Sequence, residues 1–201
     1  RVAAGISAVA APPATGRQDE GIAITMDSGK PHTPPSALRS LARLLRHRWT
    51  DGGLHHALPP DMLQRLAERI TASEQRHTGQ IRICVEGGLP LSYIWRGAGA
   101  RERAITQFGK LRVWDTEYNN GVLIYLLLAD HAIEIVADRG LTQCVSPATW
   151  HATVAHMSEA FRTDHYEDGL TQALAEVSAL LVTHFPRDAA QGLDDRGNEL
   201  P

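Results

Sequence analysis

The chain has 201 residues, 43% of them hydrophobic and 21% charged, which fits one soluble domain with a good core and is short for two. Its 20 Lys and Arg against 23 Asp and Glu give a formal net charge of -3, so composition offers no reason to expect nucleic acid or an anionic membrane as a partner. The longest apolar run, Val122–Ala129, is too short to cross a bilayer, so no transmembrane segment is expected.

The two cysteines, Cys84 and Cys144, form neither a C-x-x-C pair nor a disulfide framework. Cys84 falls within a predicted strand and is interpreted as a small buried side chain in a reducing compartment. We therefore expect a cytoplasmic protein. The N-terminal stretch RVAAGISAVAAPPA has a faint signal-sequence character, and we interpret it as an upstream tail, with a clipped targeting segment as the alternative.

Residues 1–36 contain many prolines and glycines and show no hydrophobic periodicity, which predicts a disordered N-terminal lead. A short helix is predicted over Pro35–Arg48, where leucines recur on one face. Pro59–His77 predicts a stronger helix, because its prolines suit a first turn and Gly79 provides a stop. The apolar face of this helix consists of Leu63, Leu66, Ala67 and Ile70.

The segment QIRICVE (80–86) alternates in hydrophobicity and predicts a strand with one face buried more than the other. Gly87, Gly88 and Pro90 end that strand. A helix is predicted next over Ala100–Leu111. Its apolar stripe consists of Ala104, Ile105, Phe108 and Leu111.

Two strands are predicted to follow a polar loop at 115–120. Gly121 opens the run GVLIYLLLA, which is apolar on both faces and predicts a central strand covered on both sides. The segment HAIEIVADRG predicts a second strand, and the tight turn at Asp130–His131 implies that the two are antiparallel. One face of the second strand carries Ile133 and Ile135, and the other carries Glu134, Val136 and Asp138.

Two amphipathic helices complete the predicted domain. Ser146 caps the first and Pro147 occupies its first turn, while the second runs from about Tyr166 to Phe185. Their apolar stripes consist of Trp150, Val154, Met157 and Phe161, and of Tyr166, Leu170, Ala173, Leu174, Val177 and Leu181. The order of elements predicts a three-layer α/β/α sandwich with a mixed central sheet over residues 37–186, followed by a polar tail at 187–201.

Three stretches of sequence resemble the TPM domain family. They are HTGQIRICVE, RERAITQFGKLRVWDTEYNNGVLIYLLLADHAIEIVADRGL, and a Trp-containing helix with an HFP ending. The resemblance is to short bacterial members that lack the signal peptide and membrane anchor of longer ones, and it covers about residues 40–186. It implies an α/β/α sandwich. It also implies a link to calcium binding in some members, and to acid phosphatase activity and photosystem repair in the plant thylakoid branch.

One departure from the family pattern is Gln80, where the short members carry Glu in the sequence H-x-G-E-I. Gln80 keeps the shape of that side chain and loses its charge. Any role that depends on a negative charge at this position is therefore in doubt.

The polar loop supplies a candidate metal site. In an extended loop Asp115, Glu117 and Asn119 project to the same side, and Asn120 adds a fourth oxygen-bearing side chain. Ligands that offer only oxygen suit Ca²⁺ or Mg²⁺. The sequence therefore predicts a divalent-cation site in this loop.

The loop is not an EF-hand. With Asp115 at position 1, the sixth position is Asn120 instead of Gly, and the twelfth is Leu126 instead of a bidentate Glu. The site must therefore be completed from elsewhere in the fold. Asp138 is the best candidate, because a tight hairpin brings it beside the start of the central strand, and Glu134 is a weaker fifth ligand.

A purely structural interpretation of the loop stays open. Asn-Asn-Gly is typical of turns, since Asn tolerates the left-handed conformation and Gly adopts it freely. Asp115 could close the preceding helix, and Asp138 could pair with Arg112 or Arg139. Acidic clusters also arise from such turn and ion-pair preferences.

Other motifs are weaker. His77 shares a helix face with Glu74, where a polar helix end is a simpler interpretation than a metal ligand. RGAGARE (96–102) lacks the third glycine and the Lys-Ser/Thr of a phosphate loop. No zinc motif and no G-x-S-x-G nucleophile elbow is present. Trp114 and Trp150 are expected to pack in the core.

These observations favour a domain that binds a divalent cation, Ca²⁺ or Mg²⁺, and acts through an unidentified protein partner. The alternative is a metal-dependent phosphatase that hydrolyses phosphomonoesters, with Asp115 or Glu117 as the base. A scaffold for assembly is a third possibility. The absence of a clear nucleophile, and of phosphate-binding cations other than Arg112 and Arg139, weighs against the phosphatase.

Overall fold

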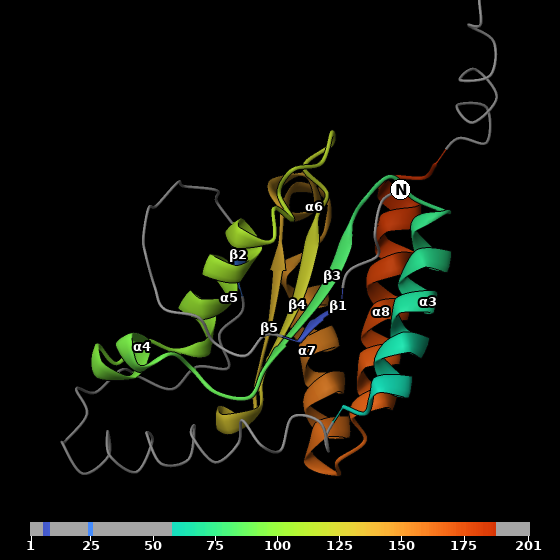
Figure 1. Cartoon of the computed structure of the whole chain (residues 1–201). Coiled ribbons are helices and arrows are strands. Elements are labelled where there is room, and N and C mark those ends of the chain that lie inside the picture. Colours follow the sequence, from blue (N-terminus) through green and yellow to red (C-terminus); the bar gives the residue numbers. More distant parts are fainter. Residues whose placement is uncertain (1–5, 9–23, 26–57, 188–201) are drawn as a thin grey trace, which may run out of the picture.

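The structure, a computed structural model, describes residues 6–8, 24–25 and 58–187 (Figure 1). Its strands are β1 (Ile6–Ala8), β2 (Ile24–Thr25), β3 (Ile81–Glu86), β4 (Val122–Leu127) and β5 (Ala132–Ala137). Its α-helices are α3 (Pro60–Glu74), α4 (Leu91–Trp95), α5 (Ala100–Lys110), α6 (Arg139–Cys144), α7 (Pro147–Arg162) and α8 (Tyr166–His184). The short 3-10 helix η2 (Leu128–Asp130) connects β4 to β5.

The strands form a mixed sheet in the order β1-β3-β4-β5-β2. Strands β3 and β4 are parallel, whereas β4 and β5 are antiparallel and pair from Val122 opposite Ala137 to Leu127 opposite Ala132. His131 turns the chain between them in the left-handed conformation, with φ of 48°. The antiparallel pair predicted from the tight Asp130–His131 connection is therefore confirmed.

Two of the strands lie in the N-terminal lead. β1 pairs parallel with β3, and β2 pairs antiparallel with β5, although the sequence predicts no regular structure in this segment. Both strands are too short to show hydrophobic periodicity, and they are recognised only by their pairing with β3 and β5. The helix predicted over Pro35–Arg48 lies outside the described residues.

Helices cover both faces of the sheet, as an α/β/α sandwich requires (Figure 1). On one face Val122, Ile124 and Leu126 pack with α3, α6, α7 and α8. On the other face Leu123, Tyr125 and Leu127 pack with α4 and α5. All six residues of β4 are buried, which confirms the prediction of a central strand covered on both sides. Each such aliphatic side chain stabilises the fold by roughly 1.5–3 kcal/mol.

Several helix boundaries and faces differ from the prediction. Helix α3 ends at Glu74, so Gly79 does not stop it and instead packs against Leu181. Helices α4 and α6 are absent from the prediction, because both are too short to show helical periodicity. Ser146 does cap α7, since its hydroxyl accepts a hydrogen bond from the Thr149 N–H.

Strand β3 and helix α5 bury polar groups at positions expected to be exposed or apolar. Glu86 at the end of β3 is fully buried, so the prediction of one less buried face is wrong there. On α5, Arg103 and Gln107 are buried, while Ile105, assigned to the apolar stripe, is 42% exposed. The helix is therefore rotated relative to the face that hydrophobicity alone indicates.

Glu86 is the reason for this rotation, because it gathers a buried hydrogen-bond network. The Arg103 guanidinium donates to both of its carboxylate oxygens, and the Gln107 amide and the Tyr125 hydroxyl each donate to one of them at 2.6 Å. Burial alone would lower the pKa of Arg103, but the hydrogen bond with Glu86, the charge of Glu86 and the contacts with Tyr93 and Tyr125 together outweigh it and raise that pKa. The charge pair is thus fully hydrogen-bonded, the condition under which burial is tolerated.

A second buried polar cluster joins the end of α3 to α8. His77 is fully buried, and its Nε2 lies 2.9 Å from the Ser73 hydroxyl, which in turn donates to Ser178 of α8. The His77 Nδ1 lies 3.1 Å from the Gly79 carbonyl oxygen. His77 is therefore part of the core, instead of a polar helix end. Burial is the main reason that the pKa of His77 is lowered to about 4, and the nearby charge of Arg76 contributes in the same direction.

Acidification from about pH 6.5 to about pH 4 should destabilise the fold through His77. In this pH window His77 is protonated in the unfolded chain, where its pKa is near 6.5. In the folded state it stays neutral, because its pKa there is about 4. The expected loss in unfolding free energy is about 3 kcal/mol. Urea unfolding of the wild type and His77→Gln at several pH values measures it.

The variant should show the smaller loss on acidification. Burial raises the pKa of Glu74 and of Asp138, so these groups contribute in the opposite direction, but equally in both proteins. Their effect therefore cancels when the two proteins are compared. Identical pH profiles for the wild type and His77→Gln would show that His77 is not held neutral.

Candidate functional site

The polar loop between α5 and β4 is shaped by its own hydrogen bonds. Arg112 and Asn119 both adopt the left-handed conformation, with φ of 52° and 51°. The Asp115 N–H donates to the Arg112 carbonyl at 3.0 Å, and the Asn119 N–H donates to the Thr116 carbonyl at 3.2 Å. The Thr116 hydroxyl accepts from the Asn120 N–H at 2.9 Å. These hydrogen bonds within the loop define its conformation.

Two glycines let this loop lie against the rest of the fold. A Cβ on Gly121 would stand 1.8 Å from the Val113 carbonyl oxygen, and one on Gly140 would stand 2.3 Å from the Tyr118 carbonyl oxygen. Both distances are far below van der Waals contact. Any side chain at these positions would push the loop away from the end of β5 and the start of α6.

Asp138 lies directly across the hairpin from the start of the central strand. Its N–H donates to the Gly121 carbonyl at 2.9 Å, and the Gly140 N–H donates to the Asn119 carbonyl at 2.8 Å. Its Oδ1 accepts from the Arg139 N–H at 2.7 Å and so caps α6. The backbone at Asp138 therefore adjoins Gly121, the residue after Asn120, at the same end of the sheet.

Each of these two side chains has one buried oxygen without a donor. Asn120 Oδ1 and Asp138 Oδ2 find no hydrogen-bond partner among the described residues. Asn120 is fully buried and Asp138 is 8% exposed. Burial raises the pKa of Asp138, because the hydrogen bond and the charge of Arg139 compensate it only in part. An amide oxygen and a carboxylate oxygen left bare in this way fit the ligand chemistry of Ca²⁺ or Mg²⁺.

The other proposed ligands differ from Asn120 and Asp138 because they are more exposed or lie farther along the strand. Asp115 and Glu117 are exposed and Asn119 is half-buried. Glu134 lies 4.0 Å from Arg101, and four residues of strand place it roughly 13 Å along β5 from Asp138. Within the described part of the chain, no three His, Cys, Asp or Glu side chains gather closely enough to hold an ion by themselves.

The aromatic residues around the loop are exposed. Trp114 is 51% exposed and Tyr118 is 43% exposed, so the prediction that Trp114 packs in the core is wrong. Trp150 of α7 is 3% exposed and does pack there. The loop backbone turns Trp114 outward, because Val113 occupies the buried position next to it.

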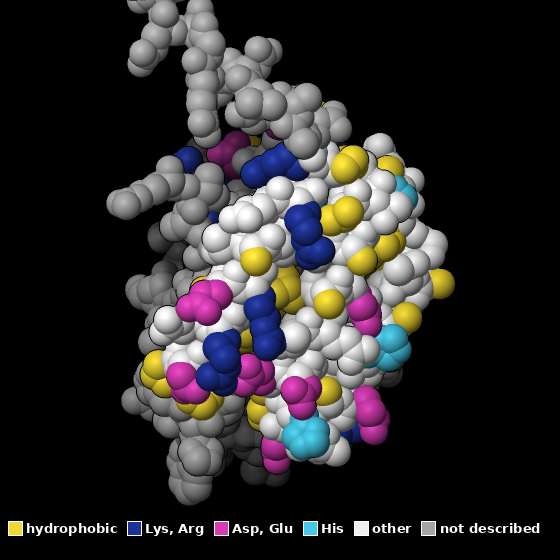
Figure 2. Space-filling model, turned by 90° about the vertical axis from the view of Figure 1, so that its right-hand side faces the viewer, with side chains coloured by type: hydrophobic (Ala, Val, Ile, Leu, Met, Phe, Trp, Pro, Cys, Tyr) yellow, Lys and Arg dark blue, Asp and Glu magenta, His cyan; other side chains and the backbone are white. Residues whose placement is uncertain are grey.

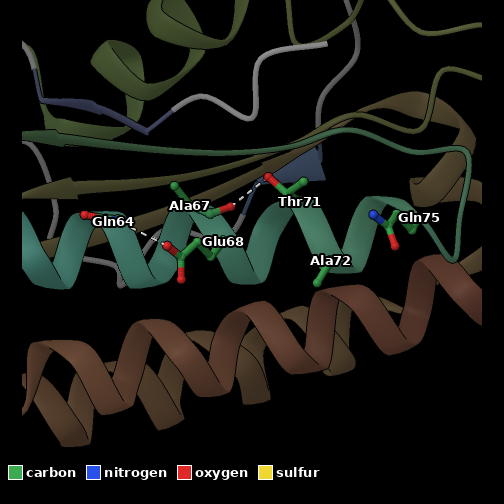
Figure 3. A pocket seen from close by; sticks show the side chains of 6 residues that line it. All are labelled: Gln64, Ala67, Glu68, Thr71, Ala72 and Gln75. Atoms are coloured by element: carbon green, nitrogen blue, oxygen red, sulfur yellow. Dashed lines mark hydrogen bonds between the residues drawn. The ribbon is translucent and has the colours of Figure 1, made fainter. Parts of the chain in front are cut away.

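The outer face of α3 carries a shallow hollow of about 440 Å³ (Figure 3). It is lined by Gln64, Ala67, Glu68, Thr71, Ala72 and Gln75. The Gln64 amide donates to Glu68, and the Thr71 hydroxyl donates to the Ala67 carbonyl. Because none of its polar side chains is buried, this hollow does not bring together the functional groups that a binding or catalytic site needs.

The face shown in Figure 2 carries charged side chains of both signs, and the two signs are mixed in its lower half. Arg65 of α3, for example, pairs with Asp61 of the same helix and with Glu167 of α8. These exposed pairs are worth little stability individually. None of the helices in the described part of the chain combines the length and the hydrophobicity that crossing a bilayer requires.

The fold defines this protein as an α/β/α sandwich in which a loop rich in oxygen-bearing side chains leads into the central strand β4. A comparison of the sequence with models of known protein families matches residues 54–180 to the TPM domain. Because this match covers more than half of the chain, the chain belongs to the TPM domain family. The family resemblance predicted from the sequence is thus confirmed.

Comparison with solved structures supports the same fold. The chain is similar to the NMR structure of the BA42 protein from the psychrophilic bacterium Bizionia argentinensis sp. nov., with a TM-score of 0.58 and 25% sequence identity. The match covers 72% of this chain and 91% of that one. No curated protein matches the chain.

Two buried polar contacts are not predictable from the sequence. One is the hydrogen-bond network around Glu86, because the alternation in QIRICVE assigns Glu86 to the less buried face of its strand. The other is Thr78, which contacts Asn120 from 42 residues away in the sequence. A contact of that separation leaves no local pattern.

Proposed function

We propose that this TPM-family domain binds a divalent cation, Ca²⁺ in preference to Mg²⁺, and that it acts through a protein partner. The site is the edge of the sheet formed by the 115–120 loop and Asp138. The observation that carries the proposal is the pair of buried oxygens without donors, Asn120 Oδ1 and Asp138 Oδ2. The exposed aromatic side chains of Trp114 and Tyr118 beside the loop support a role in protein contact.

The burial of Asp138 favours a cation over a purely structural role. A buried carboxylate is costly unless a positive charge or several donors compensate it, and here one backbone N–H serves one oxygen. Ca²⁺ accepts carboxylate, amide and backbone carbonyl oxygens together with water, in irregular geometry. It therefore needs no cluster of three acids, whereas Mg²⁺ demands near-octahedral geometry.

Titration with Ca²⁺ should raise the thermal stability of the wild type, because an ion that binds the native state stabilises it by mass action. At 100 times the dissociation constant the expected gain is about 2.7 kcal/mol. Asp138→Asn keeps the cap on α6 but removes the charge. It should therefore be at least as stable as the wild type without ion, and should lose most of the gain from Ca²⁺. Thermal unfolding and isothermal titration calorimetry with Ca²⁺ and Mg²⁺ check both effects.

The matched control is Asp168→Asn, which removes the same charge from an exposed position on α8 and should leave Ca²⁺ binding unchanged. Asp115→Ala tests the exposed part of the loop, and should weaken binding less than Asp138→Asn does. If neither ion raises the melting temperature of the wild type, the proposal is wrong. The loop is then a turn that leads into β4.

Metal-dependent hydrolysis of phosphomonoesters is the second candidate function. It is favoured by the exposed guanidinium groups of Arg112 and Arg139 beside the loop, since Arg binds phosphate oxygens in pairs of hydrogen bonds. A bound ion would polarise the phosphate and lower the pKa of a water molecule. Asp115 or Glu117 would accept the proton from that water. Hydrolysis of p-nitrophenyl phosphate with Ca²⁺ or Mg²⁺, abolished in both Asp138→Asn and Arg139→Ala, is the result that supports it.

A further inference from the structure

The Thr78 hydroxyl stands between the candidate ion site and the end of α8. Its Oγ1 accepts a hydrogen bond from the Asn120 side-chain amide at 3.0 Å and donates to the Phe185 carbonyl oxygen at 3.5 Å. The Thr78 N–H donates to the same Phe185 carbonyl at 3.0 Å. Thr78 is thus held on one side and holds Asn120 on the other.

The direction of these hydrogen bonds determines which end of the Asn120 amide faces Thr78. A carbonyl oxygen can only accept, so the Thr78 hydroxyl proton is directed to Phe185. The hydroxyl oxygen is then an acceptor, which selects the NH₂ end of the Asn120 amide. The opposite end, Oδ1, is turned to the position where it has no donor. With a flipped amide, the Thr78 hydroxyl would have to donate to Oδ1 and give up its hydrogen bond to the Phe185 carbonyl oxygen.

Close packing prevents this segment from shifting. A Cβ on Gly79 would stand 2.7 Å from the Asn120 carbonyl oxygen and 2.5 Å from the Leu181 side chain of α8. On the other side of Thr78, His77 is fully buried and forms an isolated β-bridge with Pro186. Thr78 therefore occupies a fixed position relative to both Asn120 and the C-terminal end of α8.

We propose that Thr78 is a positioning residue that aims the Asn120 Oδ1 oxygen at the divalent cation. The inference rests on the proposed cation site, and deepens it by naming what pre-orients one of its ligands. Residues that orient a metal ligand by hydrogen bonding typically change metal affinity by about 10- to 100-fold when removed. Thr78 also connects the site to Phe185, at the end of α8, through its backbone N–H and its hydroxyl.

Thr78→Val removes the hydroxyl at nearly constant shape, and should weaken Ca²⁺ binding by about 10-fold or more. Thr78→Ser restores the hydroxyl and should bind within about threefold of the wild type. The matched control is Ser178→Ala, which removes a buried hydroxyl that accepts hydrogen bonds from Ser73 and Arg76 instead of Asn120. It should lower stability and leave Ca²⁺ affinity unchanged. Calorimetric titration of the four proteins, with ion-free melting temperatures, separates affinity from stability.

A measurement without ion tests the orientation separately from the cation site. In ¹⁵N spectra of the ion-free protein, the Asn120 side-chain NH₂ signals should exchange slowly with solvent in the wild type and in Thr78→Ser, and faster in Thr78→Val. Equal affinity and equal exchange in Thr78→Val and the wild type would overturn the inference even if the wild type binds Ca²⁺. Failure of the wild type to bind any ion would overturn the proposed function, and with it the role of Thr78 in binding. The exchange experiment would still decide whether Thr78 holds Asn120.

Discussion

Replacement of Arg103 by leucine should lower the free energy of unfolding by about 3–5 kcal/mol, because it leaves the Glu86 carboxylate buried without its positive partner. Glu86 would keep its hydrogen bonds from Gln107 and Tyr125, but these neutral donors do not replace a guanidinium. Chemical denaturation with an unchanged m-value measures the loss. No other single charge removal in the described part of the chain is expected to cost as much.

Two comparisons test the assignment of this cost to the buried charge. Arg162→Leu removes an exposed guanidinium that pairs with Glu159, and should change stability by less than about 1 kcal/mol. The double variant Glu86→Gln, Arg103→Leu removes both charges and keeps an acceptor for Tyr125. It should recover a large part of the stability lost in Arg103→Leu. If the two substitutions add their costs instead, packing of the Arg103 side chain is the dominant contribution.

Gly121→Ala should destabilise the fold by about 3 kcal/mol or more, because the new methyl group would stand 1.8 Å from the Val113 carbonyl oxygen. That oxygen belongs to the backbone, so relief requires displacement of the loop from β4. The displacement should also abolish any Ca²⁺-induced stabilisation, since Asn120 adjoins Gly121. Thermal unfolding with and without Ca²⁺ measures both consequences.

Gly109→Ala is the matched control for this substitution. Gly109 lies in α5, and a Cβ there meets nothing within 4 Å. Alanine is the better helix former, so this variant should gain about 0.5–1 kcal/mol. A Gly121→Ala protein as stable as the wild type would contradict the close approach of Val113 to the central strand.

The central hairpin and the two C-terminal helices could be predicted from the sequence because their signals are local. The run GVLIYLLLA is apolar on both faces, and the short Asp130–His131 connection allows no crossover, so β4 and β5 had to be adjacent. The same reasoning indicated that Asp138 lies beside the start of β4, which is where the structure has it. Whether Asp138 binds an ion stays a prediction.

The face of α5 shows where such reasoning stops. Hydrophobic periodicity assigns apolar residues to the core, so it predicted that Ile105 is buried and Arg103 is exposed. Arg103 is nevertheless buried, because Glu86 from another element compensates its charge. No property of the helix sequence alone reveals that partner. A buried charge pair can be recognised only when both halves are placed in space.

By itself, the sequence determined the family, the α/β/α architecture and the oxygen-rich composition of the loop, since these follow from long stretches of pattern and from hydrophobic periodicity. Tertiary structure alone decided which polar groups become buried and what compensates them. Thr78, Asn120 and Asp138 come from three separate segments, and their hydrogen bonds exist because packing of α8 and of the hairpin brings those segments together. The two oxygens left without donors are a result of that packing, and therefore have no signature in the sequence.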